Sequence, residues 1–175
     1  MIYPRYYKLA PEKVIRLEPN QIFVFGSNLR GRHGAGAALD AAVYFGAVEG
    51  QGSGLQGRSL AVPTKDRYMK PLSSTDVRQS IRASVLDVLQ KNHSTELVFS
   101  AVGCGFAGHH PEDIAAVFCT EEVWPAYITS RIHLPPVFMR HVCLHLTRRM
   151  LHLMNATDMQ AFYSMQDAAR LYLPA

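Results

Sequence analysis

Two segments of the chain run from an apolar strand directly into a glycine-rich loop and then into a helix. The first is IFVFGSNLRGRHGAGAA, residues 22–38, and the second is LVFSAVGCGFAGHHPEDIAA, residues 97–116. A glycine loop that opens a helix presents backbone N–H groups to an anion, and ligands of open α/β sheets bind beyond the carboxyl ends of the strands. Two such loops indicate a ligand with two separated parts, such as a diphosphate and a sugar. The alternative is that these glycines serve tight turns and close helix–sheet packing.

The glycine spacing disfavours two common nucleotide sites. Neither segment fits GxxxxGK[ST] or GxGxxG followed by its later acid, so a P-loop or dinucleotide-binding site is not expected. A third glycine cluster, residues 46–57, precedes the segment SLAVPTK. We interpret it either as a mobile loop over the ligand or as a long disordered connection.

Several side chains near these loops have chemistry of their own. His33 could titrate near neutral pH, as a ligand contact or as a solvated loop residue. Cys104 lies in a loop rich in N–H groups that could lower its pKa, although a small buried residue without a histidine partner is the preferred interpretation. His141 and His145 have the i, i+4 spacing that can bind zinc, but no Glu stands at the HExxH position, so a polar helix face is expected and no metal site is predicted.

The elements that position these loops alternate between strand and helix. Val77, Ile81, Val85 and Val88 have helical spacing, with an N-cap available among residues 73–76. Strands are expected at Val14–Leu17, Ile22–Phe25, Ser59–Pro63 and Leu97–Val102, and helices at Gly34–Phe45, Thr75–Lys91 and Pro111–Val123. This alternation predicts an α/β fold with a largely covered sheet.

All twelve glycines lie between Gly26 and Gly108, and the last 67 residues contain none. We therefore expect a body over residues 1–125 and a helical C-terminal extension over residues 130–175, joined by the proline-containing segment 124–136. Two helices, Val137–Met154 and Thr157–Leu173, would form an αα-hairpin. The first of them is apolar over more than one face, which predicts a homodimer through these helices.

Composition limits the class of protein. The chain has 175 residues, 48% hydrophobic and 18% charged, which excludes disorder. It lacks an apolar run long enough for a membrane span and an N-terminal apolar stretch typical of a signal peptide, and its three cysteines fit a reducing compartment, so a cytoplasmic location is expected. The net charge of +4 comes largely from the extension, which could attract nucleic acid or an acidic partner or could be a solvated basic face.

The motifs FGSN, GRHGAGAA, PTKD, GCGFAG and EDIA occur in this order over about residues 20–120. In order and spacing they resemble the macro domains, particularly the branch that contains the terminal ADP-ribose glycohydrolase, and are similar to small macro-like proteins of bacteriophages and bacteria. The resemblance implies a three-layer fold with a mixed sheet flanked by helices, and an ADP-ribose-type ligand with no metal or cofactor. The extension lies outside it.

The resemblance also implies where that ligand would bind. The first loop would surround the distal ribose, and the Gly-Cys-Gly loop would hold the phosphates through backbone N–H groups. The residues so assigned are Gly26, Ser27, Asn28, Gly31, Arg32, Gly34, Ala35, Gly36, Thr64, Gly103, Cys104, Gly105, Phe106, Ala107 and Gly108.

Catalysis depends on one position at which the chain departs from the glycohydrolase pattern. The lysine that attacks the sugar aligns with Lys65, whereas the acid that follows the Gly-Cys-Gly motif aligns with Ala107. Asp113 and His33 are the candidates to replace that acid. Two classes of function therefore stay open: a hydrolase that removes ADP-ribose from a modified macromolecule with Lys65 as nucleophile, and a reader or sequestering module without turnover. A third, weaker interpretation is a nucleic-acid-associated scaffold that uses the basic extension.

Overall fold

The computed structural model describes residues 8–129 and 131–153. The chain divides into two compact units, Met1–Val142 and Cys143–Ala175. The first unit holds all the strands that the structure describes. In the second, residues 143–153 continue a helix, and residues 154–175 lie outside the described part of the chain.

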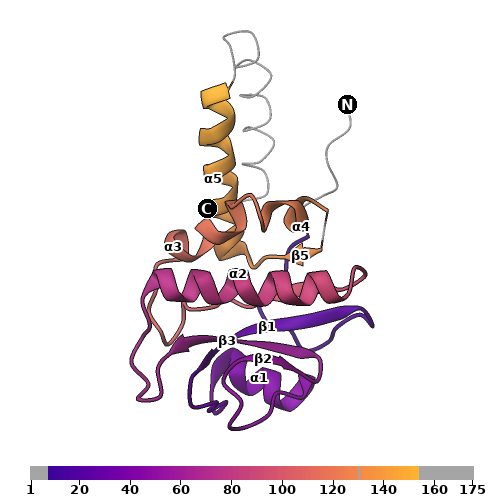
Figure 1. Ribbon diagram of the computed structural model, residues 1–175, viewed down its shortest axis with the longest axis vertical. Coiled ribbons are helices and arrows are strands. Elements are labelled where there is room, and N and C mark those ends of the chain that lie inside the picture. Colours follow the sequence, from indigo (N-terminus) through magenta and orange to yellow (C-terminus); the bar gives the residue numbers. More distant parts are fainter. Residues whose placement is uncertain (1–7, 130, 154–175) are drawn as a thin grey trace. The chain divides into compact units, whose positions relative to one another are not determined.

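A five-stranded mixed sheet forms the centre of the first unit (Figure 1). Its strands are β1 (Gln21–Asn28), β2 (Gly54–Gln56), β3 (Ser59–Lys65), β4 (Glu96–Phe99) and β5 (Ile132–His133). The spatial order is β2-β3-β1-β4-β5. β1 pairs in parallel with β3 and β4, β4 pairs in parallel with β5, and only β2 is antiparallel to its neighbour. The carboxyl ends of β1, β3 and β4 therefore lie at one edge of the sheet.

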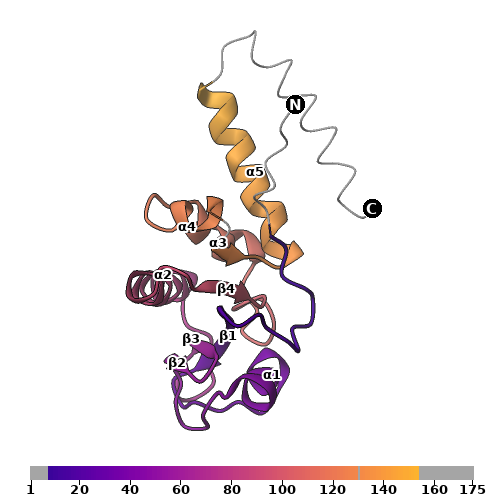
Figure 2. The ribbon, with the colours of Figure 1, turned by 90° about the vertical axis from the view of Figure 1, so that its right-hand side faces the viewer.

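Helices cover both faces of the sheet. The helices of the described residues are α1 (Gly36–Phe45), α2 (Ser74–Lys91), α3 (Pro111–Ala115), the 3-10 turn η1 (Ala116–Cys119), α4 (Trp124–Ile128) and α5 (Pro136–Leu153). Val98 of β4 belongs to the core cluster that includes α1, whereas the next residue, Phe99, packs edge-on against Phe118 of η1. Because successive strand residues point to opposite faces, α1 lies on one face, and η1 with its neighbours α2 and α3 lies on the other, as Figure 2 shows.

The apolar pattern of the sequence explains these layers. Phe23 and Phe25 of β1 pack with Phe45 of α1, and the rings of Phe23 and Phe45 lie 5.1 Å apart. On the other face, α2 buries its predicted stripe of Val77, Ile81, Val85 and Val88. Ser73 caps α2, because its Oγ accepts a hydrogen bond from the N–H of Asp76 at 3.1 Å. A mixed sheet flanked by helices is thus confirmed.

Several elements differ from the sequence expectation. Residues 14–17 form no strand, although Val14 is buried. The helix expected over residues 111–123 ends after five residues and tightens into η1. β2, α4 and β5 were not expected, and the two residues of β5 are too few to show a periodic pattern.

The first unit extends beyond the boundary near residue 125 that the glycine distribution indicated. Its last residues take part in the core: Leu134, Phe138 and Val142 are fully buried, and the rings of Phe118 and Phe138 lie 5.7 Å apart. The helix expected at residues 157–173 lies outside the described residues, so the hairpin and the homodimer through it stay predictions.

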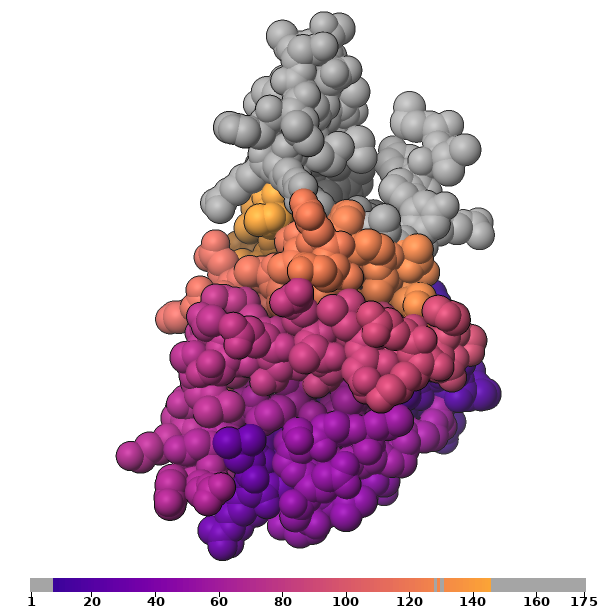
Figure 3. Space-filling model, viewed as in Figure 1, coloured from indigo at the N-terminus to yellow at the C-terminus, as the bar shows by residue number. Residues whose placement is uncertain are grey.

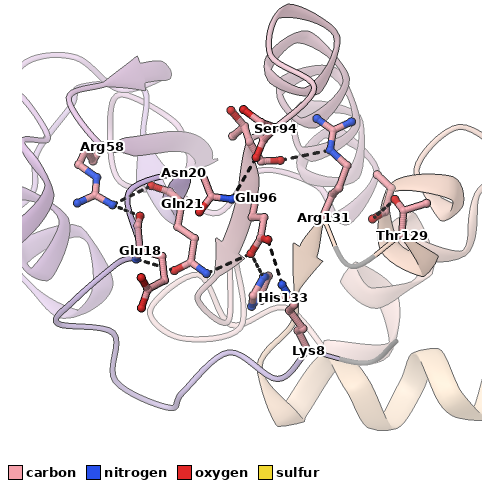
Figure 4. Close-up of polar contacts among 12 residues, drawn as sticks. Lys8, Glu18, Asn20, Gln21, Arg58, Ser94, Glu96, Thr129, Arg131 and His133 are labelled. Carbon is pink, nitrogen blue, oxygen red and sulfur yellow. Dashed lines mark hydrogen bonds and ion pairs between the residues drawn. The ribbon is translucent and has the colours of Figure 1, made fainter. Parts of the chain in front are cut away.

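A network of polar side chains ties the amino ends of the central strands together (Figure 4). Glu96 of β4 accepts hydrogen bonds from Lys8 at 3.0 Å, from Gln21 of β1 at 3.2 Å and from Nε2 of His133 of β5 at 2.7 Å. Burial alone would raise the pKa of Glu96, but these three donors outweigh it and lower the pKa to about 2. Burial lowers the pKa of His133, against the opposing effect of Glu96, so a neutral imidazole donates to the carboxylate.

The network predicts a stability that falls with acid. Glu96 has a lower pKa in the folded protein than in the unfolded chain, so its ionised form stabilises the fold at pH values above the unfolded pKa of 4.5. This contribution to stability is lost as pH falls from 4.5 toward 2. Glu96→Gln should lower the free energy of unfolding by about 2 kcal/mol at pH 7 and should flatten its dependence between pH 5 and pH 2. Urea denaturation over this range tests the prediction, with exposed Glu12→Gln as the control. Parallel pH profiles for the parent and Glu96→Gln would contradict it.

Candidate functional site

The connections of the sheet diverge at its carboxyl edge, and the region between the two glycine loops there is called the crevice below. β1 leads to α1 on one face, whereas its two neighbours β3 and β4 lead to α2 and α3 on the other face. Adjacent strands whose connections leave on opposite faces mark the position where α/β proteins bind ligands. Both glycine loops of the sequence begin at this edge.

Three chain segments meet closely at the start of the crevice. A Cβ on Gly26 of β1 would lie 3.3 Å from Cγ2 of Thr64 and 3.4 Å from the backbone nitrogen of Gly103. Thr64 in turn donates its hydroxyl to the carbonyl of Ser27 at 3.0 Å. The lack of a side chain at Gly26 thus brings the end of β3 and the second glycine loop against β1.

The first glycine loop is closed by Asn28. Nδ2 of Asn28 donates to the carbonyl of Arg32 at 2.8 Å, and its Oδ1 accepts from the N–H of Arg32 at 3.1 Å. Gly31 has φ +71°, and a Cβ there would clash with the backbone of Gly50 and Gln51. Asn28 and Gly31 therefore shape the loop from within, and the Asn28 amide is already engaged by protein atoms.

His33 is a buried side chain that holds the same loop in place, and it is not solvated. Its Nε2 lies 3.1 Å from Oγ of Ser27, its ring packs edge-on against Phe25 at 5.1 Å, and its backbone N–H donates to Glu49 at 3.1 Å. Burial lowers the pKa of His33, although Glu49 acts in the opposite direction. A neutral imidazole held in this way positions the loop and does not project into the crevice as a titrating acid.

The N-terminus of α1 is open. Its N-cap Ala35 offers no side-chain acceptor, and no acidic residue stands in its first turn. A Cβ on Gly34 would meet no atom within 4 Å. The first N–H groups of a helix lack partners within the helix and attract negative charge, so this end of α1 can receive an anion.

The second glycine loop offers a matching row of donors. Gly103 and Gly108 have φ of +82° and +72°, and the loop is closed by bonds from Gly108 N–H to Gly105 O and from His109 N–H to Gly103 O. Among the described residues, the N–H groups of Gly105, Phe106 and Ala107 donate to no protein acceptor. Successive unpaired N–H groups in a turn form a concave site for anions.

Cys104 does not have the lowered pKa that the loop could have produced. Burial raises the pKa of its thiol to about 11, and the thiol donates weakly to the carbonyl of Val102 at 3.7 Å. Cys104 is therefore a neutral, partly buried side chain, because desolvation disfavours the thiolate. This agrees with the preferred interpretation from the sequence.

Phe106 connects the two loops and Lys65. Its ring extends from the second loop to the start of α1, where a Cβ on Gly36 would lie 3.3 Å from Cε2 of Phe106. Nζ of Lys65, at the end of β3, lies 5.8 Å from the centre of the same ring. Phe106 is 77% exposed, so its ring is an accessible surface between the second loop, the start of α1 and Lys65.

Neither Asp113 nor Asp66 forms an ion pair with Lys65 within the described residues. Asp113 lies in the first turn of α3, on the other face of the sheet from α1, and its side chain is exposed. Asp66 uses Oδ1 to accept the N–H groups of Tyr68 and Lys70. Ala107 is buried, and among the described residues no carboxylate forms an ion pair with Lys65. Glu49, which the sequence analysis did not single out, is the acid that the fold brings to the first loop.

The third glycine cluster has a different role from either expectation. Gly46 ends α1 in a left-handed conformation, and residues 54–56 form β2. Between them, Gly50 donates to the carbonyl of Gly31 at 2.9 Å. The segment is therefore a hydrogen-bonded support of the first glycine loop.

No metal site is found within residues 8–129 and 131–153: these residues contain no group of three His, Cys, Asp or Glu side chains that could hold an ion. None of the described helices is long and apolar enough to cross a membrane.

The packing of the first loop predicts a large loss of stability when one of its glycines is replaced by alanine and almost none when another is. Gly31→Ala forces a left-handed φ on alanine and a clash with residues 50–51, so it should lower the free energy of unfolding by about 2 kcal/mol or more. Gly34→Ala places its Cβ in open space and should change that energy by less than about 0.5 kcal/mol. Urea denaturation of the two variants checks the pair, and equal stabilities would show that the loop is not packed in this way.

Comparison with known proteins adds no further assignment. No protein-family model matched this chain, and neither did any curated protein or solved structure. Lys65 and Phe106 lie together at the edge of the sheet where both glycine loops begin.

Proposed function

We propose that the crevice binds ADP-ribose or a related nucleotide diphosphate sugar. The observation that carries the proposal is the convergence of two open sets of N–H groups on one exposed aromatic ring, with a lysine beside it. The N–H groups of Gly105, Phe106 and Ala107 and the uncapped start of α1 suit a diphosphate, because both present partial positive charge without a protein acceptor. The Phe106 ring offers a flat apolar surface for a sugar face.

The reacting part of the ligand, the distal ribose, would lie at Lys65. This side chain is half-buried at the carboxyl end of β3, pairs in register with Asn28, and approaches Phe106. For hydrolysis, the neutral amine would bond to the anomeric carbon of the distal ribose, the bond to the modified macromolecule would break, and water would later replace the lysine nitrogen. Such a lysine must be partly neutral when it attacks.

Binding without rapid turnover is the better supported of the two functions. Proton transfer by a positioned acid typically contributes 10²–10⁴ in rate, and the structure gives Lys65 no carboxylate partner among the described residues. Asp113 is exposed on α3 and forms no ion pair with Lys65 in the described part of the chain, and His33 is buried within its loop. The position of Lys65 in the crevice nevertheless favours hydrolysis as the second candidate function.

Ligand binding is tested at Gly105. A Cβ there meets no atom within 4 Å, so Gly105→Ala should fold and bind, whereas Gly105→Glu should block the phosphates by volume and negative charge. Isothermal titration with ADP-ribose should show at least a hundredfold weaker binding for Gly105→Glu, about 2.7 kcal/mol. Gln90→Glu, on the exposed side of α2, adds the same charge elsewhere and should bind like the parent. A folded Gly105→Glu variant with parental affinity would place the ligand elsewhere.

Turnover is tested at Lys65. If the protein releases ADP-ribose from an ADP-ribosylated substrate, Lys65→Ala should abolish release and keep the affinity for ADP-ribose within about tenfold, because a nucleophile acts mainly in the transition state. Exposed Lys91→Ala should leave release unchanged. Stable retention of the modified substrate by the parent would identify a binding module, and release that persists in Lys65→Ala would exclude Lys65 as the nucleophile.

A further inference from the structure

A cluster of positive charge lies on two neighbouring loops at the carboxyl edge of the sheet. The loop of residues 29–32 and the loop of residues 65–70 are joined by a hydrogen bond from Leu29 N–H to Lys65 O at 2.9 Å. Figure 3 shows them near each other at the lower left, in indigo and magenta. Their charged residues are the cations Arg30, Arg32, Lys65, Arg67 and Lys70 and the single acid Asp66. With five cations and one acid, their net charge is +4.

The side chains of the three arginines in these loops take no part in the hydrogen bonds and ion pairs of the described fold. Within the described ranges, the guanidinium groups of Arg30, Arg32 and Arg67 form no ion pair and no hydrogen bond with protein atoms. Asp66, the acid within these two loops, is engaged with backbone N–H groups of its own loop at 2.8 and 2.9 Å. The three guanidinium groups therefore present their donors to solvent, where an anion can approach them.

An open hollow of about 400 Å³ lies between the two loops and is lined by Leu29, Arg30, Arg67 and Tyr68. Tyr68 is 76% exposed and Leu29 is 52% exposed. A large aromatic ring left this open beside two arginines offers a stacking surface next to phosphate-binding groups.

The loop that carries Arg67 and Tyr68 is held in one conformation. Lys65 and Pro71 form a bridge at its base, and the N–H of Asp66 donates to the carbonyl of Lys70 at 2.8 Å. Met69 adopts φ +67°, a conformation that residues other than glycine rarely adopt. The exposed side chains are thus presented by a pre-organised backbone, which reduces the entropy lost on binding.

We propose that this hollow binds a single-stranded nucleic acid, with a base stacked on Tyr68 and the flanking phosphates on Arg30 and Arg67. Arginine pairs with phosphate through two parallel hydrogen bonds, and each base has a face that can stack on an aromatic ring. An acidic peptide would use the arginines but not the tyrosine ring, and the bases of a duplex are already stacked on one another. The proposal does not depend on ADP-ribose binding, because none of the hollow's lining residues belongs to either set of phosphate-binding N–H groups.

The test is fluorescence anisotropy of the full chain with a labelled oligothymidylate at several salt concentrations. Arg30→Gln and Arg67→Gln should each weaken binding and should each reduce the slope of log affinity against log salt by about 0.7, the value expected for one phosphate contact on a single strand. Tyr68→Leu should weaken binding about tenfold, whereas Tyr68→Phe should retain it. Exposed Arg16→Gln, which removes one charge outside the hollow, should have little effect.

Each other outcome would overturn the proposal. Absence of binding at low salt excludes a nucleic-acid site. Binding that Arg30→Gln, Arg67→Gln and Tyr68→Leu all leave unchanged places the nucleic acid on another surface. If poly-glutamate displaces the oligothymidylate completely, and if Tyr68→Leu binds the oligothymidylate like the parent, the partner is an acidic protein segment. ADP-ribose titrations of the same variants keep the two sites distinguishable, since parental ADP-ribose affinity is expected in Tyr68→Leu.

Discussion

The close approach of three chain segments at Gly26 is the contact on which the candidate site depends. With no side chain at this position, Thr64 and the backbone of Gly103 lie against β1 at near-contact distance. Lys65, at the end of β3, and Phe106, in the second loop, therefore lie at the edge where α1 begins. A larger residue at position 26 would separate the loops, and the crevice would lose the arrangement that gives both loops access to one ligand.

The two edges of the sheet differ in how far their polar groups find hydrogen-bond partners within the protein. At the amino edge, Glu96 is saturated by Lys8, Gln21 and His133, and these contacts join β1, β4 and β5. At the carboxyl edge, the N–H groups of Gly105, Phe106 and Ala107 and those at the start of α1 have no acceptor among the described residues, and the guanidinium groups of Arg30, Arg32 and Arg67 have no partner among them either. These are the groups that a ligand can satisfy.

The sequence was a good guide where a feature depends on local pattern. The stripe from Val77 to Val88 predicted α2, and the two strand–loop–helix junctions predicted that both glycine loops begin at one edge of the sheet. It failed where tertiary packing decides. Nothing in the loop sequence shows that His33 turns inward onto Phe25 or that Phe106 crosses to Gly36. The hollow at Tyr68 arises only because β1 and β3 are neighbours, and β5 is too short to carry a pattern.

The central claim is that the two glycine loops bind one ligand together, and amide chemical shifts test it most directly. In a titration of the ¹⁵N-labelled protein with ADP-ribose, the N–H resonances of residues 34–38 and of residues 103–108 should shift along one saturation curve with a single dissociation constant. Resonances of the Glu96 network, at the opposite edge of the sheet, should stay in place. Saturable shifts confined to one loop, or absent from both, would contradict the account.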